Sequence, residues 1–141
     1  MKVSVIIKGK SVQSIKPNAT LVELVQKLNT HKIGALVVSE NGTDIVGIAS
    51  ERDVVRHMQG NFDELKNFYV TDIMTKSVFT CNSHATVAEL MNIMTNMRIR
   101  HIPVVDDEQK LLSIVSIGDV VKARIDEIDA ERKALTDYIT S

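Results

Sequence analysis

Two stretches decide how this chain folds: VGIASERD at residues 46–53 and, 66 residues later, LSIVSIGD at residues 112–119. In each stretch an apolar run ends at a serine, and an aspartate follows three residues after that serine. A short apolar run of this kind predicts a buried strand, and Ser-x-x-Asp is a helix-capping pattern. Both stretches therefore predict a strand that leads directly into a helix.

The two stretches belong to a longer duplication. Residues 12–56 align with residues 78–122 without a gap, at a constant offset of 66, and 12 of the 45 aligned pairs are identical. Unrelated sequences of ordinary composition would give about 3 identities. Two copies are too few for a solenoid, so we expect them to bury their apolar faces against each other.

Each copy predicts the same α/β order of elements: strand, helix, strand, strand, helix. Capping boxes of the form Thr-x-x-Glu, at residues 20–23 and 86–89, open the first helix of each copy. Two short apolar strands and a second helix follow. The predicted strands are residues 35–38, 45–49, 102–105 and 111–115, and the second helices are residues 50–58 and 116 to about 139.

The duplication divides the chain into two predicted domains. Residues 1–66 form the first domain, with an N-terminal strand and the start of a linker, and residues 67–141 form the second, with a C-terminal helical extension. The linker, residues 59–69, is polar and aromatic and has some helical character.

Composition narrows the function classes. Hydrophobic residues make up 44% of the chain and charged residues 25%, which suits a compact globular unit, and the formal net charge of −1 gives no long-range attraction to nucleic acid or to a membrane. The single cysteine excludes an internal disulfide. Residues 1–8 lack the apolar core of a signal peptide, and no apolar run approaches the roughly 20 residues of a membrane span, so we expect a cytoplasmic protein.

The residues resemble a known family. VGIASERD is similar to the strand-to-helix signature of cystathionine beta-synthase (CBS) domains: glycine, two aliphatic or small residues, Ser or Thr, two variable residues and Asp. The second copy matches except that Ser113 replaces the glycine. RIRHIPVVD at residues 98–106 is similar to the family's second-strand signature, and DIMT at residues 72–75 to its leader.

The resemblance covers residues 3–125 and implies two tandem CBS domains that form a pseudo-two-fold pair, a Bateman module. It also implies a homodimer, because such pairs commonly dimerise, and clefts between the copies for AMP, ADP, ATP, NAD or S-adenosylmethionine. With no enzyme or transporter domain within the chain, the regulated partner would be a separate, unidentified protein, and we expect no catalytic activity and no catalytic cofactor.

The physical chemistry of the first junction suits a nucleotide. The start of a helix offers free backbone amides and a partial positive charge to phosphate, beside the hydroxyl of Ser50. An ionised Asp53 can accept two hydrogen bonds from a ribose diol, and Arg52 offers a fixed fork of donors to phosphate oxygens. Gly47 leaves backbone room for close approach of a ligand.

The resemblance adds further candidate positions. It implies aliphatic contacts to adenine near the first strand of one copy and the second strand of the other, and cationic phosphate contacts beside them. Those positions are Val12, Gln13, Met74, Val78, Phe79, Ile102 and Pro103, with Arg100 and His101 as the cationic contacts. In the second copy Ser116 and Asp119 repeat the junction, but Gly118 lacks the guanidinium of Arg52, so this site is predicted to be weaker, altered or empty.

A simpler interpretation stays open: Ser-x-x-Asp in both copies acts only as a helix cap. The chain would then be a structural dimerisation module without a ligand. A structure with Asp53 turned back onto its own helix end, and with the adjoining crevice filled by side chains, would contradict the binding hypothesis.

Other candidate features have structural interpretations. Cys81 and His84 could form a nucleophile and base, but they are predicted to be a buried thiol and an exposed turn histidine. The histidine spacings do not suggest a zinc site. The apolar stripe after residue 120, namely Val121, Ile125, Ile128, Leu135 and Ile139, lies on a helix with a solvated charged face and could pack against a second chain.

Overall fold

The computed structural model describes residues 1–60 and 62–141 and contains two three-stranded sheets of the same topology. In each sheet the first strand pairs in parallel with the second, and the second pairs antiparallel with the third. The strands are β1 (Ser14–Ile15), β2 (Ala35–Val38) and β3 (Gly47–Ser50), then β4 (Cys81–Asn82), β5 (His101–Val105) and β6 (Leu111–Ser116). The predicted strands are therefore confirmed, with ends that differ by one or two residues.

Each sheet is accompanied by two helices that begin directly after the predicted capping residues. They are α2 (Leu21–His31) and α3 (Glu51–Met58) in the first copy, and α5 (Val87–Met97) and α6 (Ile117–Thr140) in the second. The hydroxyls of Thr20, Ser50, Thr86 and Ser116 each accept a hydrogen bond from the backbone amide three residues later. The predicted order of elements is confirmed in both copies.

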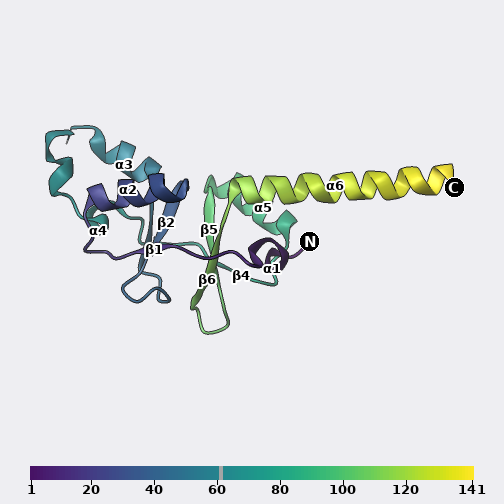
Figure 1. Cartoon of the computed structure of the whole chain (residues 1–141), viewed down its shortest axis with the longest axis horizontal. Helices are drawn as coiled ribbons and strands as arrows, with labels where there is room; N and C mark the ends of the chain where they lie inside the picture. Colours follow the sequence, from purple (N-terminus) through teal and green to yellow (C-terminus); the bar gives the residue numbers. More distant parts are fainter. Residues whose placement is uncertain (61) are drawn as a thin grey trace.

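The segment that precedes each copy packs on the other copy. Helix α1 (Val3–Ile7) lies against the second core, where the Val3 amide donates to the Ala85 carbonyl at 2.8 Å. Helix α4 (Val70–Ile73) lies against the first core in the same way, with the Val70 amide bonded to the Ala19 carbonyl at 2.9 Å. Figure 1 shows this exchange, because the N-terminus lies beside α6 and the chain then crosses to β1.

This packing crosses the predicted division at residues 66 and 67. Val3, Ile6 and Ile7 pack on the second core because their i, i+3, i+4 spacing gives α1 one apolar face. Val70 and Ile73 are buried in the first core. The predicted linker contains a 3-10 helix, η1 (Phe62–Asn67), which agrees with its predicted helical character; Asn61 lies outside the described residues.

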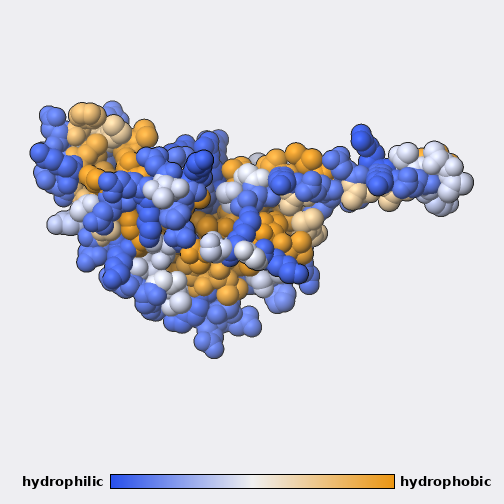
Figure 2. All heavy atoms as spheres, viewed as in Figure 1, coloured by the Kyte–Doolittle hydropathy of each residue, from blue (hydrophilic) through white to orange (hydrophobic). Residues whose placement is uncertain are grey.

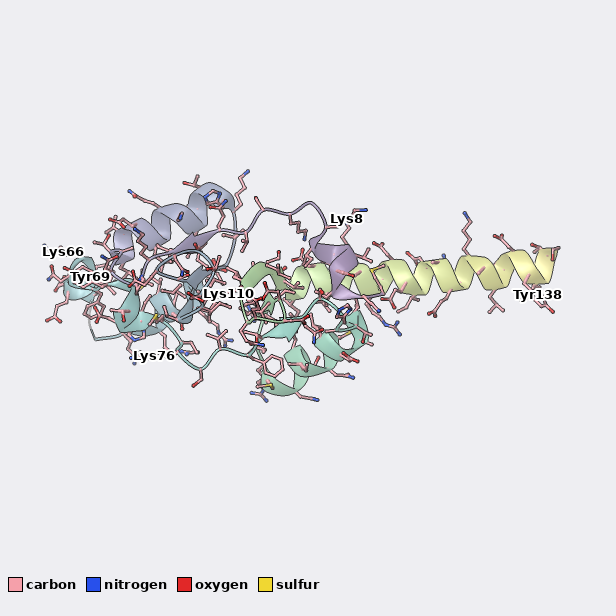
Figure 3. All side chains as sticks on the ribbon, turned by 90° about the horizontal axis from the view of Figure 1, so that it is seen from below. Lys8, Lys66, Tyr69, Lys76, Lys110 and Tyr138 are labelled. Carbon is pink, nitrogen blue, oxygen red and sulfur yellow. The ribbon has the colours of Figure 1, made fainter. Side chains whose placement is uncertain are left out.

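The turns that precede β3 and β6 hold the two copies together at one end. Asp44 and Lys110 form an ion pair, and the Leu111 amide donates to the Thr43 carbonyl at 2.8 Å. Figure 3 shows Lys110 between the two halves of the molecule. Asp44 and Lys110 are equivalent positions of the repeat, so this contact lies close to the pseudo-two-fold axis.

Helix α6 extends well beyond the body of the molecule (Figure 1). Its first turns pack through Val120 and Ala123, whereas every residue from 128 onwards is exposed. None of the described helices has both the length and the apolar character that a membrane crossing requires.

Candidate functional site

A cavity of about 300 Å³ opens between the two copies, at the lower end of the range for small-molecule sites. The first copy supplies the start of β2 and the β3–α3 junction, and the second supplies the residues before β4 and the turn from α5 to β5. Its lining is Gly34, Ala35, Ile48, Ser50, Glu51, Arg52, Asp53, Arg56, Thr75, Ser77, Val78, Phe79, Met97, Arg98, Ile99, Arg100 and His101.

The cavity has a strongly cationic wall. Four arginines line it, Arg52 and Arg56 from α3 and Arg98 and Arg100 from the α5–β5 turn, against two carboxylates. Arg98 adopts a left-handed backbone conformation (φ 55°) at the end of α5, as its repeat equivalent Lys32 does at the end of α2 (φ 53°). Because the whole chain carries a formal charge of only −1, this cluster is a local feature that suits an anionic ligand.

Asp53 is turned back onto the start of its own helix. Its Oδ2 atom accepts hydrogen bonds from the Ser50 amide at 2.9 Å and from the Ser50 hydroxyl at 3.0 Å. This is a complete capping box, and Asp53 is buried while it still lines the cavity. Oδ2 therefore serves the cap, as the capping interpretation predicts, whereas the cavity beside Asp53 is open, and Oδ1 has no hydrogen bond among the described residues.

Gly47 serves a different purpose from the predicted one. A Cβ atom there would lie 2.7 Å from the Met74 sulfur and 2.9 Å from the Thr75 carbonyl oxygen. Thr75 forms a β-bridge with Ile48, through bonds of 3.0 and 2.9 Å between their backbones. The space above Gly47 is thus filled by the chain that enters the second copy, and neither Gly47 nor Met74 lines the cavity.

The second junction is engaged by the protein's own lysine. Asp119 accepts a bond from the Ser116 amide at 3.0 Å and forms an ion pair with Lys10 at 3.1 Å. Burial raises the pKa of Asp119, but the Ser116 bonds and Lys10 outweigh it and hold that pKa below its usual value. The Lys10–Asp119 pair therefore joins the segment before β1, which also contains Val12 and Gln13, to the start of α6 at the predicted second site.

The cavity brings seven of the predicted site residues together and leaves the others outside its lining. Ser50, Arg52, Asp53, Val78, Phe79, Arg100 and His101 line the cavity together. Ile102 and Pro103 are buried in β5, where Ile102 belongs to the second core, and neither they nor Val12 and Gln13 are among the lining residues. The residues that were missed include Gly34 and Ala35, and the repeat could have identified them as equivalents of Arg100 and His101.

His101 lies between the two junctions. A Cβ atom on Gly34 would lie 3.2 Å from a Glu51 carboxylate oxygen and 3.3 Å from the His101 ring, so these two side chains approach each other there. Burial lowers the pKa of His101 below its usual 6.5, and Arg100 adds to this, while Glu51 and Asp119 oppose it. The fold therefore favours the neutral imidazole.

We expect His101 to make the stability of the protein depend on pH below 6.5. The unfolded chain takes up this proton first as the pH falls, so the contribution is complete above 6.5 and is lost progressively below it. Thermal unfolding between about pH 5 and pH 7.5 should show a shallower pH dependence for His101→Gln than for the parent. His84→Gln, at an exposed turn, is the matched control, and equal slopes for parent and His101→Gln would contradict this role.

The alternative nucleophile has the properties of a structural thiol. Burial raises the pKa of Cys81 to about 11, which keeps the sulfur protonated, and His84 is exposed with its amide bonded to Asn82. Within residues 1–60 and 62–141 no three His, Cys, Asp or Glu side chains group as metal ligands. A larger hollow of about 770 Å³ beside β1 belongs to the first copy alone and presents only Lys16 and Lys27 as cationic groups.

Known proteins support the same description. The CBS domain family model matches residues 7–60 and 70–126. The chain is 36% identical to the mitochondrial CBS domain-containing protein CBSX3 of Arabidopsis thaliana, over 94% of this chain and 68% of that protein. It is 35% identical to an uncharacterized 17.7 kDa protein of Acidianus ambivalens, over 89% and 74%.

Solved structures extend the comparison to three dimensions. The CBS-domain containing protein ATU1752 from Agrobacterium tumefaciens is 39% identical, with a TM-score of 0.82 over 88% of this chain and 99% of that one. The CBS domain pair of protein MJ0100, solved with 5-methylthioadenosine and S-adenosyl-L-methionine, is 25% identical with a TM-score of 0.77, over 90% and 98%. This chain belongs to the CBS domain family, as a tandem pair that forms a Bateman module.

Proposed function

We propose that the protein is a regulatory module that binds an adenine nucleotide in the cavity between its two CBS domains. The observation that carries the proposal is the cluster of Arg52, Arg56, Arg98 and Arg100 around one open cavity. Guanidinium groups bind phosphate oxygens through paired donors, and four of them in one cleft exceed what Glu51 and Asp53 can neutralise. AMP, ADP, ATP and NAD all carry this chemistry, and S-adenosylmethionine shares their adenosine.

The ribose would be held at the β3–α3 junction. Oδ1 of Asp53 and Arg52 lie at one wall of the cavity, and Val78 and Phe79 supply an apolar surface on the other. The Glu51 and Asp53 amides at the start of α3 are already bonded to the Gly34 carbonyl and the Ser50 hydroxyl. The solved pair of MJ0100 holds two adenosine derivatives, which supports an adenosine ligand in this fold. Binding would favour one relative arrangement of the two domains, and a separate regulated protein would respond to that arrangement.

The protein acts without catalysis, as a homodimer in the cytoplasm. The protonated Cys81 supports the absence of nucleophilic chemistry, and the exposed apolar residues of α6 support dimer formation.

A structural dimerisation module is the second candidate. The capping box of Asp53 favours it, because the carboxylate already has a function in holding the start of α3. The ion pair of Lys10 with Asp119 similarly engages the second junction without a ligand.

Thermal unfolding with AMP, ADP, ATP, NAD and S-adenosylmethionine distinguishes the two candidates. A ligand at a hundredfold excess over its Kd should raise the free energy of unfolding by about 3 kcal/mol. Mass spectrometry of the purified protein under non-denaturing conditions should detect the same ligand. No shift with any of the five at millimolar concentration, and no nucleotide carried through purification, would favour the structural module.

A further inference from the structure

Helix α6 carries an unpartnered apolar stripe. Val121, Ile125, Ile128, Leu135 and Ile139 are each between 41% and 72% exposed. When Arg132 is included as the one polar member, successive positions of the stripe are alternately four and three residues apart. This spacing is the seven-residue repeat of a coiled coil. Figure 2 shows hydrophobic side chains along α6 where it leaves the body of the molecule, and Figure 3 shows Tyr138 at its distant free end.

We propose that this stripe pairs antiparallel with the same stripe of a second copy of the chain. The inference rests on the proposed homodimer and gives it a specific interface. In the register that the charges select, Ile125 lies beside Ile128 of the second copy, and the reverse. The two helices then overlap from residue 117 to residue 136, a length of about 30 Å at 1.5 Å per residue.

The charges that flank the stripe are complementary in this arrangement. Basic residues, Lys122 and Arg124, flank its first half, and acidic residues, Asp129 and Glu131, flank its second half. An antiparallel pair brings Lys122 to Asp129 of the other copy, and this contact is made twice. Arg124 approaches Glu131 of the other copy, but it already pairs with Glu127 of its own helix at 3.0 Å, so the proposal rests on Lys122 and Asp129. Within the described chain Lys122 and Asp129 make no ion pair, so both are available to a partner.

A parallel pair is less favourable for a specific reason. It would place Arg132 of one copy directly against Arg132 of the other, inside the apolar seam. The antiparallel register instead places Arg132 beside Val121, where its aliphatic stem can cover the valine and its charge can reach water. The same register places Leu135 beside Gly118 at the first turn of α6, where the missing side chain leaves room.

Charge exchange between Lys122 and Asp129 tests the pairing. In the antiparallel dimer Lys122→Glu should raise the dimer dissociation constant about tenfold at low ionic strength, because two attractive pairs become repulsive. The double variant Lys122→Glu/Asp129→Lys should restore the parent value. An equimolar mixture of the single variants Lys122→Glu and Asp129→Lys should form a heterodimer as stable as the parent dimer. Sedimentation velocity measures all of these.

Lys133→Glu is the matched control, since it makes the same charge change on the same helix away from the stripe, and should leave the dissociation constant unchanged. Circular dichroism would verify that each variant is folded. A double variant weaker than Lys122→Glu would show a parallel pair, because the positive charge introduced at position 129 would then face Arg124, and would overturn the proposal. A parent dimer unaffected by Lys122→Glu would show that the copies meet elsewhere. A parent that stays monomeric would remove the proposed homodimer itself, while nucleotide binding is measured independently.

Discussion

Replacement of Asp53 by asparagine is expected to weaken nucleotide binding about hundredfold while the protein stays folded. Each hydrogen bond to a charged acceptor contributes about 1.5–3 kcal/mol, and the substitution removes the negative charge that would receive the ribose hydroxyls. The amide oxygen of asparagine can still accept the Ser50 bonds that close the cap. Isothermal titration calorimetry with the nucleotide that gives the largest thermal shift measures the change in Kd.

Asp119→Asn is the matched control, because Asp119 holds the equivalent position and is paired with Lys10. It should leave binding at the first cavity unchanged. Asp53→Ala should weaken binding at least as much, and should lower the free energy of unfolding by about 1 kcal/mol through loss of the cap. If Asp53→Asn binds nucleotide as tightly as the parent, Asp53 is only a cap and the binding site lies elsewhere.

Replacement of Gly47 by serine is expected to lower the free energy of unfolding by about 2 kcal/mol, since overpacking a tight contact typically costs 1–3 kcal/mol. The new Cβ would lie 2.9 Å from the Thr75 carbonyl oxygen, which is backbone and cannot rotate away. The bridge between Ile48 and Thr75 would have to open, and Thr75 lines the cavity. Urea unfolding measures the stability, and titration of the same variant should show weaker nucleotide binding.

The second copy provides the control for this substitution. Ser113 stands at the position equivalent to Gly47 and is itself buried, and the described chain forms no β-bridge at Ile114 like the one at Ile48. Ser113→Gly should therefore change stability by less than about 1 kcal/mol, in the range of an ordinary glycine substitution in a strand. Equal effects of the two substitutions would show that the close contact with Thr75 does not constrain Gly47.

Local patterns in the sequence predicted the fold well because the determining interactions are local. Short apolar runs predicted the strands, and hydroxyl residues at helix starts predicted all four main helices. The duplication supplied the repeated topology. The packing of α1 on the second core and of α4 on the first core was not predictable in this way. Val3 and Val70 are buried by contacts with residues far along the chain.

The cavity-lining residues were predicted partly from the first junction and partly from the resemblance, which supplied Val78, Phe79, Arg100 and His101. Ser50, Arg52 and Asp53 were found from the junction, but the use of Oδ2 in the cap depends on rotamers that no pattern specifies. The sequence suggested a ligand contact at Gly47. The actual neighbour, Thr75, lies 28 positions later in the chain, so no local pattern reveals that it fills this space. Ile102 and Pro103 are buried because β5 packs inside the second domain, and a resemblance between motifs does not predict the burial of single residues along a strand.

The contact between Asp44 and Lys110 has a consequence for the choice of partner domain. A residue that lies near a two-fold axis meets its own counterpart, so an identical charge in both copies would repel itself. Opposite charges at this one repeated position attract when a first domain meets a second domain, whereas two first domains would oppose aspartate to aspartate and two second domains lysine to lysine. The ion pair therefore favours the pairing of a first domain with a second domain over the pairing of two like domains.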